Sequence, residues 1–329
     1  HRDLHLSLRR QRQMCIRDRL VTNKKLYLVS GRTYEPLAEK IANELGIVLG
    51  DPNLAEFANG EVHCRFSESI RGCDAFIVQT HSGSDRASIN DSLMEQLIMV
   101  DAARRASAKR ITVVCPSFGY GRQDRKASGR EPITAKLVAN LFKEAGASRL
   151  VSVDLHSGQT QGFFDGPVDH LTAMPVLVEK LASLKGKLTI VSPDAGRVKV
   201  AERYAMTLGA ELAIVHKRRS HSSFNTVEAR EVVGDVSGRV CVLVDDMIDT
   251  AGTICSAAEQ LAERGASQIV AAATHGVFSG PAAERLSESP VEKIIVTDTL
   301  PLQENMQIDK VEVLSVAPLI AEAISACLL

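Results

Sequence analysis

The sequence has no excess of charge of either sign, no apolar run of membrane-spanning length and no closely paired cysteines. Its 39 basic and 40 acidic residues leave a net charge of −1. No field over the whole molecule therefore draws the chain to nucleic acid or to a membrane surface, and any phosphate chemistry must use local positive patches. We expect neither nucleic acid nor a membrane among its partners.

None of the cysteines forms a CxxC pair. Two of them, Cys115 and Cys241, lie in apolar runs typical of strands. This usage is typical of reduced core thiols and predicts a cytoplasmic protein. The seven are Cys15, Cys64, Cys73, Cys115, Cys241, Cys255 and Cys327.

Length and composition predict a globular protein of about two domains, with 329 residues, 45% hydrophobic and 24% charged. Residues 1–19 differ from the rest: they hold six arginines, with no clear period and no secretory apolar region. A transit peptide or a basic arm would be Arg-rich. Asp3 and Asp18 interrupt the run, however, and Ser and Ala are scarce. We expect residues 1–22 to be a disordered or artefactual extension outside the fold.

From Lys25 onward, short β-branched segments alternate with amphipathic ones. This alternation predicts an α/β fold in which mainly parallel sheets are flanked by helices. We expect strands at 26–30, 75–79, 111–115, 150–154 and 240–244, and helices at 34–45, 89–107, 134–144 and 254–264.

The second half of the chain echoes the first in three places. Val29-Ser30 and Val191-Ser192 each precede a predicted helix that ends in Leu-Gly. The other echoes pair residues 110–114 with 239–243, and the segment from Gly146 to His156 with that from Gly265 to His275. They predict two similar α/β domains, which we place at residues 23–170 and 171–329.

Residues 242–253 combine a strand, an acidic pair, a small-residue loop and the start of a helix. Successive N–H groups and the positive helix end make an anion site there, and Gly252 allows a phosphate to approach closely. The adjacent Asp245 and Asp246 would repel that phosphate, so they fit sugar hydroxyls or a metal better. Phosphate beside vicinal hydroxyls indicates a ribose phosphate. The alternative is an ordinary strand–turn–helix with a solvated acidic end.

Two further segments follow predicted strands at the edge where such sheets bind ligands. Alternation in an extended chain places Asp154 and His156 on one side, where they can ligate a metal or orient a catalytic histidine. His156 capping the following helix is an equal alternative. In Ser192-Pro193-Asp194-Ala195-Gly196-Arg197, N–H groups can hold a diphosphate while Asp194 reaches its cation. Alone, this segment is also an ordinary turn.

Two basic clusters and an aromatic turn complete the candidates. His216-Lys217-Arg218-Arg219 opens a polar stretch, and a basic loop of this kind can close over a transferring phosphoryl group. Gly121 to Lys126 can grip a triphosphate. In the turn Phe57 to Glu61, a ring can stack on adenine, although a plain β-turn explains these residues alone as well.

In their order along the chain, these motifs resemble the ribose-phosphate diphosphokinase (PRPP synthetase) family over about residues 25–327. The resemblance implies two type I phosphoribosyltransferase-like domains and the reaction ATP + ribose 5-phosphate → AMP + 5-phosphoribosyl 1-diphosphate (PRPP). It also implies Mg²⁺ as cofactor and a homohexamer in which a neighbouring subunit supplies the adenine-binding turn. The anomeric hydroxyl would attack the β-phosphorus in line.

The resemblance also implies a role for each matching residue. Lys217 and Arg219 would be catalytic, and His156 and Asp194 would lie at the metal. ATP would be bound by Phe57, Asn59, Gly60, Glu61, Arg122 and Gln123, and ribose 5-phosphate by Arg219, Asp245, Asp246, Asp249, Thr250, Ala251, Gly252 and Thr253.

Two residues depart from the family pattern, because many members have Asp at the place of Asn59 and Gly at that of Arg197. A phosphoribosyltransferase is one alternative, but it leaves Phe57 to Glu61 and Arg122 to Lys126 without a role. An inert regulatory subunit is another, but it would be expected to carry changes near Lys217.

Overall fold

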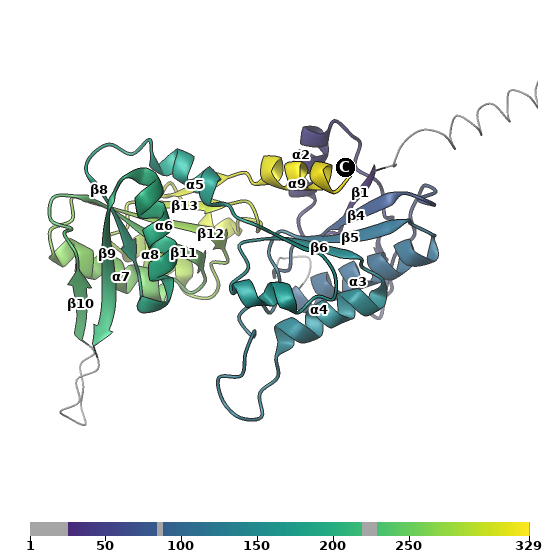
Figure 1. Ribbon diagram of the computed structural model, residues 1–329, viewed down its shortest axis with the longest axis horizontal. Coiled ribbons are helices and arrows are strands. Elements are labelled where there is room, and N and C mark those ends of the chain that lie inside the picture. The colour runs from purple at the N-terminus through teal and green to yellow at the C-terminus, as the bar shows by residue number, and fades with distance from the viewer. Residues whose placement is uncertain (1–25, 84–87, 219–228, 329) are drawn as a thin grey trace, which may run out of the picture.

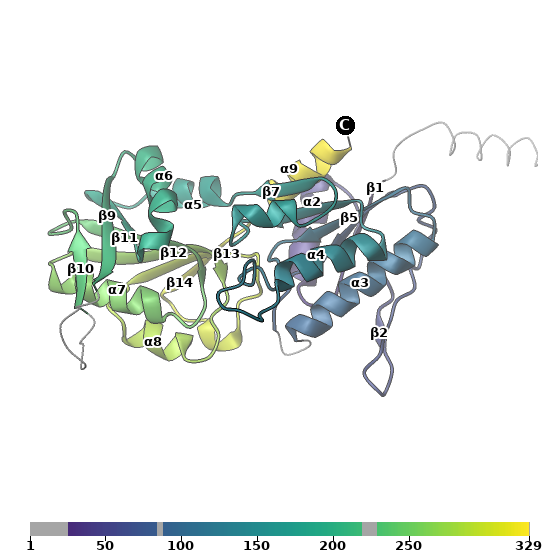
Figure 2. The same ribbon diagram turned by 60° about the horizontal axis from the view of Figure 1, so that its bottom comes forward.

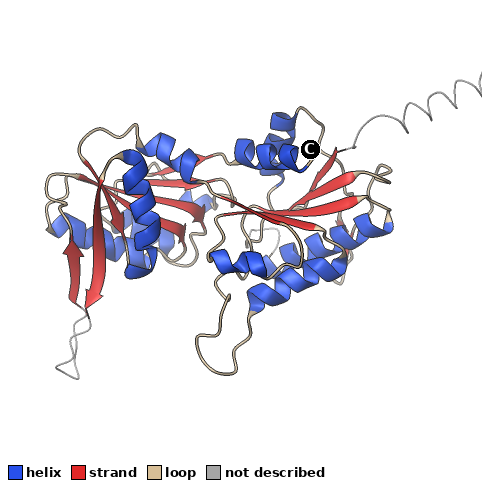
Figure 3. Ribbon diagram, in the orientation of Figure 1, coloured by secondary structure: helices blue, strands red, loops and turns tan. Residues whose placement is uncertain are grey.

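The computed structural model describes residues 26–83, 88–218 and 229–328. Within them the chain forms two large sheets, each flanked by helices on both faces, and one small two-stranded sheet (Figures 1 and 3). The predicted α/β fold with mainly parallel sheets is therefore confirmed. The predicted extension at residues 1–22 lies outside the described residues, and the division at 170/171 stays a prediction.

The first sheet has five strands in the order β1-β4-β5-β6-β7, and all neighbours are parallel. Helices α3 (Ile89–Arg105) and α4 (Thr134–Ala145) cover one face, where Met99 and Phe142 are fully buried. Helix α2 (Glu35–Leu45) covers the other face. The strands are β1 Leu26–Ser30, β4 Asp74–Val78, β5 Arg110–Cys115, β6 Arg149–Val153 and β7 Val168–Leu171.

The second sheet has seven strands in the order β10-β9-β8-β11-β12-β13-β14, and only the β9–β10 pair is antiparallel. Helices α7 (Gly252–Glu263) and α8 (Ala282–Glu288) cover one face, and α5 (Met174–Leu181) and α6 (Val198–Leu208) cover the other. The strands are β8 Leu188–Ser192, β9 Glu211–Arg218, β10 Ala229–Val233, β11 Val240–Ile248, β12 Gln268–Gly276, β13 Lys293–Thr297 and β14 Val311–Leu314. No helix in these described ranges is long and apolar enough to cross a membrane.

The last helix ties the two halves together. Helix α9 (Ala317–Cys327) follows the second sheet in the chain but packs against α2 of the first (Figure 1). Ile320 and Ile324 are fully buried in the same cluster as Leu37 and Ile41. The two sheets therefore depend on each other for part of their packing.

Strand order corrects two of the three sequence echoes. By position in the sheets, β1 corresponds to β8, β4 to β11 and β5 to β12. The first echo pairs β1 with β8, in agreement with their positions in the two sheets. The other two match β5 with β11 and β6 with β12, one strand out of step, and are wrong in register. Each β–α unit repeats a similar pattern of glycine, small residues and apolar strand, so segments one unit apart look alike.

A small hairpin projects from the first half. Strands β2 (Ala55–Glu56) and β3 (Val62–His63) pair antiparallel, and their turn carries Phe57, which is 57% exposed. Figure 2 shows the hairpin projecting from the first half, beyond helix α3. Its aromatic ring therefore lies on the surface of the chain and not in its core.

Candidate functional site between the two halves

Polar side chains from both halves meet at a cavity of about 250 Å³. Arg122 and His156 come from the first half, while Asp194, Arg197 and residues 245–254 come from the second. The cavity lies beyond the carboxyl ends of β6, β8 and β11, the edge where parallel sheets bind ligands. Most of the residues proposed for ribose phosphate and metal thus lie together, although they are far apart in the sequence.

The loop at 249–253 leads into a helix start. Helix α7 begins at Gly252, and the left-handed backbone falls on Ala251, whose φ is 59°. Arg285 Nη1 donates to the carbonyl of Thr250 at 2.9 Å and fixes the loop from outside. The N–H groups of the first turn of α7 and the positive helix end make this loop an anion site.

The acidic pair lies within strand β11 and not after its end, as had been expected. The strand was predicted to end at Val244, but it continues to Ile248, so Asp245 and Asp246 lie within it. The nine-residue β12 runs alongside, with Asp245 opposite Ala273 and Ile248 opposite Gly276. A parallel ladder is built from backbone groups, so carboxylates at the strand end do not interrupt it.

Arg197 binds both acids. Its Nε lies 3.0 Å from Asp245 Oδ1 and its Nη2 lies 2.6 Å from Asp246 Oδ1. The three side chains are only 19%, 14% and 10% exposed, respectively. Burial, with the neighbouring Asp246, raises the pKa of Asp245. Burial acts the same way on Asp246, but hydrogen bonds with His156 and Asp245 and the charge of Arg197 outweigh it and lower the pKa of Asp246.

The ring of His156 joins this cluster from the other half of the chain. Its Nδ1 lies 2.7 Å from Asp246 Oδ2 and 2.9 Å from Arg197 Nη2. Nδ1 cannot both donate to the carboxylate and accept from the guanidinium, and the carboxylate is the stronger partner. With the proton on Nδ1, Nε2 keeps a lone pair. The following 3₁₀ turn (Gly158–Gly162) has no side-chain cap, so the capping alternative for His156 is not found.

Asp194 caps its own turn. Its Oδ1 accepts from the N–H groups of Gly196 (2.8 Å) and Arg197 (3.2 Å), so these two donors, expected to face a diphosphate, already have a partner. Among the described residues, no donor is bound to Oδ2. A carboxylate oxygen with substrate phosphates and water suits Mg²⁺, and a metal-binding histidine usually donates its other N–H to a carboxylate. Asp194 Oδ2 and His156 Nε2 are therefore suited to ligate a metal, although the described residues hold no group of three or more His, Cys, Asp or Glu side chains arranged for one.

Asp154 takes a different role from the one expected. At this residue φ is 38°, so the extended chain that would place Asp154 and His156 on one side is not found. The Asp154 carboxylate accepts from Ala173 N at 2.9 Å and from Thr274 Oγ1 at 2.6 Å. His275 Nε2 lies 3.1 Å from the Asp154 carbonyl. Asp154 thus links the two halves through Thr274 and His275, and it also lines the larger cavity described below.

Arg122 crosses the cavity to the second half. Its Nη1 lies 2.6 Å from Asp249 Oδ2, and Ser279 Oγ donates to Asp249 Oδ1. Burial acts to raise the pKa of Asp249, but these two partners outweigh it and lower the pKa. A residue expected to bind ATP is therefore paired with one expected to bind ribose 5-phosphate, and the two proposed sites are contiguous.

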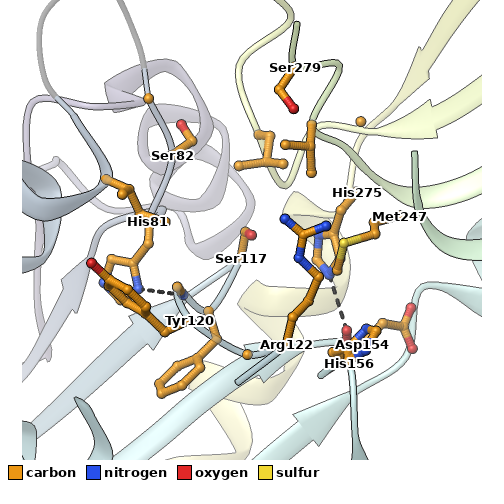
Figure 4. Close-up of a pocket in the computed structure, with 18 of the residues that line it drawn as sticks. His81, Ser82, Ser117, Tyr120, Arg122, Asp154, His156, Met247, His275 and Ser279 are labelled. Carbon is orange, nitrogen blue, oxygen red and sulfur yellow. Dashed lines mark hydrogen bonds between the residues drawn. The ribbon is translucent and has the colours of Figure 1, made fainter. Parts of the chain in front are cut away.

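A second cavity, of about 360 Å³, adjoins the first and shares Arg122, His156 and Met247 with it (Figure 4). The loop at 117–123, including Gln123, lines one side, and the other side is lined by Met247, His275, Leu300, Pro301 and Gln303. Buried His81 holds this loop, because its Nδ1 accepts from Gly119 N at 2.9 Å. The side-chain oxygen of Gln123 accepts from Thr134 Oγ1 at 2.6 Å.

The remaining predicted residues form three groups. Residues 57–61, which include Asn59, Gly60 and Glu61, line neither cavity. Lys217 lies in β9, opposite Arg230 of β10, and the structure describes its backbone. Arg219 lies outside the described residues.

Sequence reasoning missed several contributors. Arg197 was noticed only as a departure from a family pattern, and neither His81 nor Thr274 was singled out. Each acts through tertiary contacts with residues dozens of positions away, 41 for Arg197 with His156 and 120 for Thr274 with Asp154. Only the expectation that strand ends converge at one edge could have pointed to them.

Comparisons with known proteins agree with the motifs. Residues 26–146 match the family model described as the N-terminal domain of ribose phosphate pyrophosphokinase, and residues 229–327 match the phosphoribosyl synthetase-associated domain. The chain is 55% identical over 303 residues to a ribose-phosphate pyrophosphokinase of Streptomyces avermitilis, with 92% of each chain covered. One from Bifidobacterium longum is 52% identical over 309 residues, covering 92% of this chain and 90% of the relative. The crystal structure of phosphoribosylpyrophosphate synthetase from Mycobacterium smegmatis matches with a TM-score of 0.86 at 50% identity, covering 92% of this chain and 99% of that one.

Proposed function

Since this chain belongs to the ribose-phosphate pyrophosphokinase family, we propose that it transfers the diphosphoryl group of ATP to ribose 5-phosphate, giving AMP and PRPP. The family predicted from the motifs is thereby confirmed. One observation carries the assignment of the site: the 249–253 loop faces Arg122 and His156 of the other half across a single cavity. An acceptor and a donor of the diphosphoryl group can therefore be held side by side.

Ribose 5-phosphate is assigned to the second half. The 5-phosphate occupies the loop of Asp249, Thr250, Ala251, Gly252 and Thr253, where the first N–H groups of α7 donate to its oxygens. Asp245 and Asp246 accept from the ribose hydroxyls beside it. Arg219 contributes a positive charge that attracts the same ligand. Ribose 5-phosphate bound in this way has its anomeric hydroxyl directed toward the cavity that both halves line.

ATP is assigned to the first half. Arg122 and Gln123 bind the triphosphate, and Arg122 leaves Asp249 to do so. Phe57, Asn59, Gly60 and Glu61 hold the adenine, with Phe57 stacking on its face. Because these turn residues line neither cavity of their own chain, we assign the adenine contact to the turn of a neighbouring subunit in a homo-oligomer, a hexamer by family resemblance.

His156 and Asp194 would hold Mg²⁺, which when bound neutralises phosphate charge and polarises the reacting phosphoryl group. The donor chemistry supports this assignment, since His156 Nε2 and Asp194 Oδ2 are the atoms that remain for a ligand. Asp246, by accepting from His156 Nδ1, fixes the ring orientation and keeps the lone pair on Nε2.

The chemistry is an in-line displacement without a covalent enzyme intermediate. The anomeric oxygen forms a bond to the β-phosphorus of ATP, and the bond from that phosphorus to the oxygen bridging to the α-phosphorus breaks, releasing AMP. The anomeric proton leaves to solvent or to a neighbouring base. Lys217 and Arg219 stabilise negative charge on the phosphoryl oxygens in the transition state. We place this reaction in the cytoplasm, because the six described cysteines form no disulfide.

The test is direct. The full chain is incubated with ATP, Mg²⁺ and ribose 5-phosphate that is labelled with ¹⁸O at the anomeric oxygen. The products are separated, and their masses are determined by mass spectrometry. We expect AMP and PRPP in equal amounts, with the label retained in PRPP. Loss of the label would contradict attack by the anomeric hydroxyl. A parallel incubation supplies PRPP and a nucleobase in place of these substrates. Reaction only in that incubation would indicate a phosphoribosyltransferase, and no reaction in either would indicate an inert subunit.

A further inference from the structure

Among the residues that the structure describes, those lining the smaller cavity carry more negative than positive charge, although the proposed ligand is an anion. Among the described residues that line it, the acids are Asp194, Asp245, Asp246 and Asp249, and the permanently charged bases are Arg122 and Arg197. Arg122 pairs with Asp249. The two acids on β11 therefore depend on Arg197 for a positive partner, with the ring of His156 beside them.

Arg197 is built into the site and does not extend into it from the surface. Its backbone N–H donates to Asp194 Oδ1, so the turn that carries Asp194 also fixes the start of the Arg197 side chain. Its guanidinium binds one oxygen of each acid through two different nitrogens, so a single positive charge serves both carboxylates. At 19% side-chain exposure, it is shielded from the screening that weakens surface pairs.

We propose that Arg197 is the internal counter-cation of the Asp245–Asp246 pair, which lets the 249–253 loop accept ribose 5-phosphate without a divalent cation. Two carboxylates beside a phosphate site repel the incoming dianion, and a cation bound by both removes that repulsion. Arg197 is thus a positioning residue that acts through the acids and does not touch the substrate. This inference rests on the proposed function, since it takes ribose 5-phosphate as the ligand of the loop.

An alternative role for Arg197 is direct contact with the transferring diphosphoryl group. The described contacts favour the counter-cation, because Nε and Nη2 are already engaged with the two acids and Nη1 lies 3.5 Å from the His156 carbonyl. The two roles make opposite predictions for added metal. A divalent cation can replace a counter-cation at the acids, but it cannot replace a guanidinium that binds the substrate itself.

The experiment measures binding of ribose 5-phosphate to the full-length protein by isothermal titration calorimetry, first in EDTA and then with excess MgCl₂. We expect the unmodified protein to bind in EDTA. Arg197→Gln should weaken binding in EDTA by about tenfold or more, as loss of a charge-assisted interaction does. Excess Mg²⁺ should close most of that gap. Arg197→Lys, which keeps the charge, should retain most of the metal-independent affinity.

Arg149→Gln is the matched control. It removes another partly buried arginine–carboxylate pair, Arg149 Nη1 to Asp169 Oδ2 at 2.6 Å, on β6 and β7 away from both cavities. It should bind ribose 5-phosphate like the unmodified protein under both conditions. Circular dichroism checks that each variant is folded, and Arg197→Leu, which also removes the charge, takes the place of Arg197→Gln if the latter does not fold.

Three outcomes would overturn the inference. They are failure of the unmodified protein to bind in EDTA, equal binding by Arg197→Gln and the unmodified protein in EDTA, and a gap that Mg²⁺ leaves unchanged. The labelled-substrate assay is run on the same preparations. If PRPP forms while any of these outcomes is found, only the role of Arg197 fails; if no PRPP forms, the proposed function itself fails.

Discussion

At the residue scale, the site relies on side chains whose charge state is fixed by burial and by one or two partners. His81 shows this most simply. Its Nδ1 accepts from Gly119 N and its Nε2 lies 2.9 Å from Gln96 Oε1, so the ring is held as the neutral tautomer with the proton on Nε2. Burial lowers the pKa of His81 to about 4, although the hydrogen bond with Gln96 acts in the opposite direction. The neutral ring is what holds the 117–123 loop in place.

We predict that His81 makes stability fall in mild acid. The unfolded chain, with a histidine pKa near 6.5, takes up the proton before the folded one does as pH falls. The contribution of His81 is therefore complete above about pH 6.5 and is lost between pH 6.5 and 4. At pH 5 the loss is about 2 kcal/mol, one and a half pKa units at ~1.4 kcal/mol each. Urea unfolding at pH 7.5 and pH 5 measures it.

The control for this prediction is His81→Gln, which keeps an acceptor but does not titrate. It should be less stable than the unmodified protein at pH 7.5, yet lose about 2 kcal/mol less on going to pH 5. An equal loss in both proteins would mean that other groups cause the acid sensitivity.

Lys217 is assigned to charge that develops only in the transition state. We predict that Lys217→Ala raises the activation free energy of the reaction by about 3 kcal/mol. This lowers kcat on the order of a hundredfold and leaves the KM for ribose 5-phosphate nearly unchanged. Steady-state kinetics at saturating ATP measure both. A variant that kept its kcat and only raised KM would show that Lys217 binds the substrate in its ground state.

At the element scale, the five strands and four helices that were given bounds from the sequence all lie in the structure, and the errors in their bounds have physical causes. The boundaries of β1 and α2 were within one residue, because apolar periodicity and Gly46, with φ 65°, mark them locally. Strand β11 extends four residues beyond its predicted end, because its ladder with β12 is a tertiary interaction. The site was predicted where a motif is contiguous, as at 245–253. Arg197 and Asp154 were not understood, because their partners lie far away in the chain.

Helix α9 is the element that most clearly joins the two halves. Ile320 is fully buried against α2, so Ile320→Ala should cost about 2–5 kcal/mol, as large-to-small core changes do. The substitution leaves a void in the packing between α9 and α2. We therefore predict faster amide hydrogen exchange in residues 35–45 than in the unmodified protein, with little change in α7. Exposed Glu322 on the same helix provides the control, and Glu322→Ala should exchange normally. Faster exchange confined to the second half would contradict this packing.

At the scale of the whole molecule, a nearly neutral chain handles highly charged ligands by concentrating charge where its halves meet. Arg122, His156, Asp154 and Thr274 all make contacts across that boundary. Any movement of one half relative to the other therefore changes the site directly. The Phe57 hairpin is the exception, since it projects from the first half and lines neither cavity.

The hairpin leads to a prediction about assembly. If Phe57 completes the adenine site of a neighbouring subunit, every working site needs two chains, and closed symmetric assembly satisfies such a contact at each copy. Phe57→Ala and Lys217→Ala then damage parts of a site contributed by different chains. In mixed assemblies of the two variants, some sites combine an intact Phe57 from one chain with an intact Lys217 from the other. PRPP synthesis by the mixture should exceed the sum of the separate variants. Subunit exchange is verified with two affinity tags, and each variant incubated alone is the control. With exchange established, activity no higher than the sum would mean that each chain builds its adenine site alone.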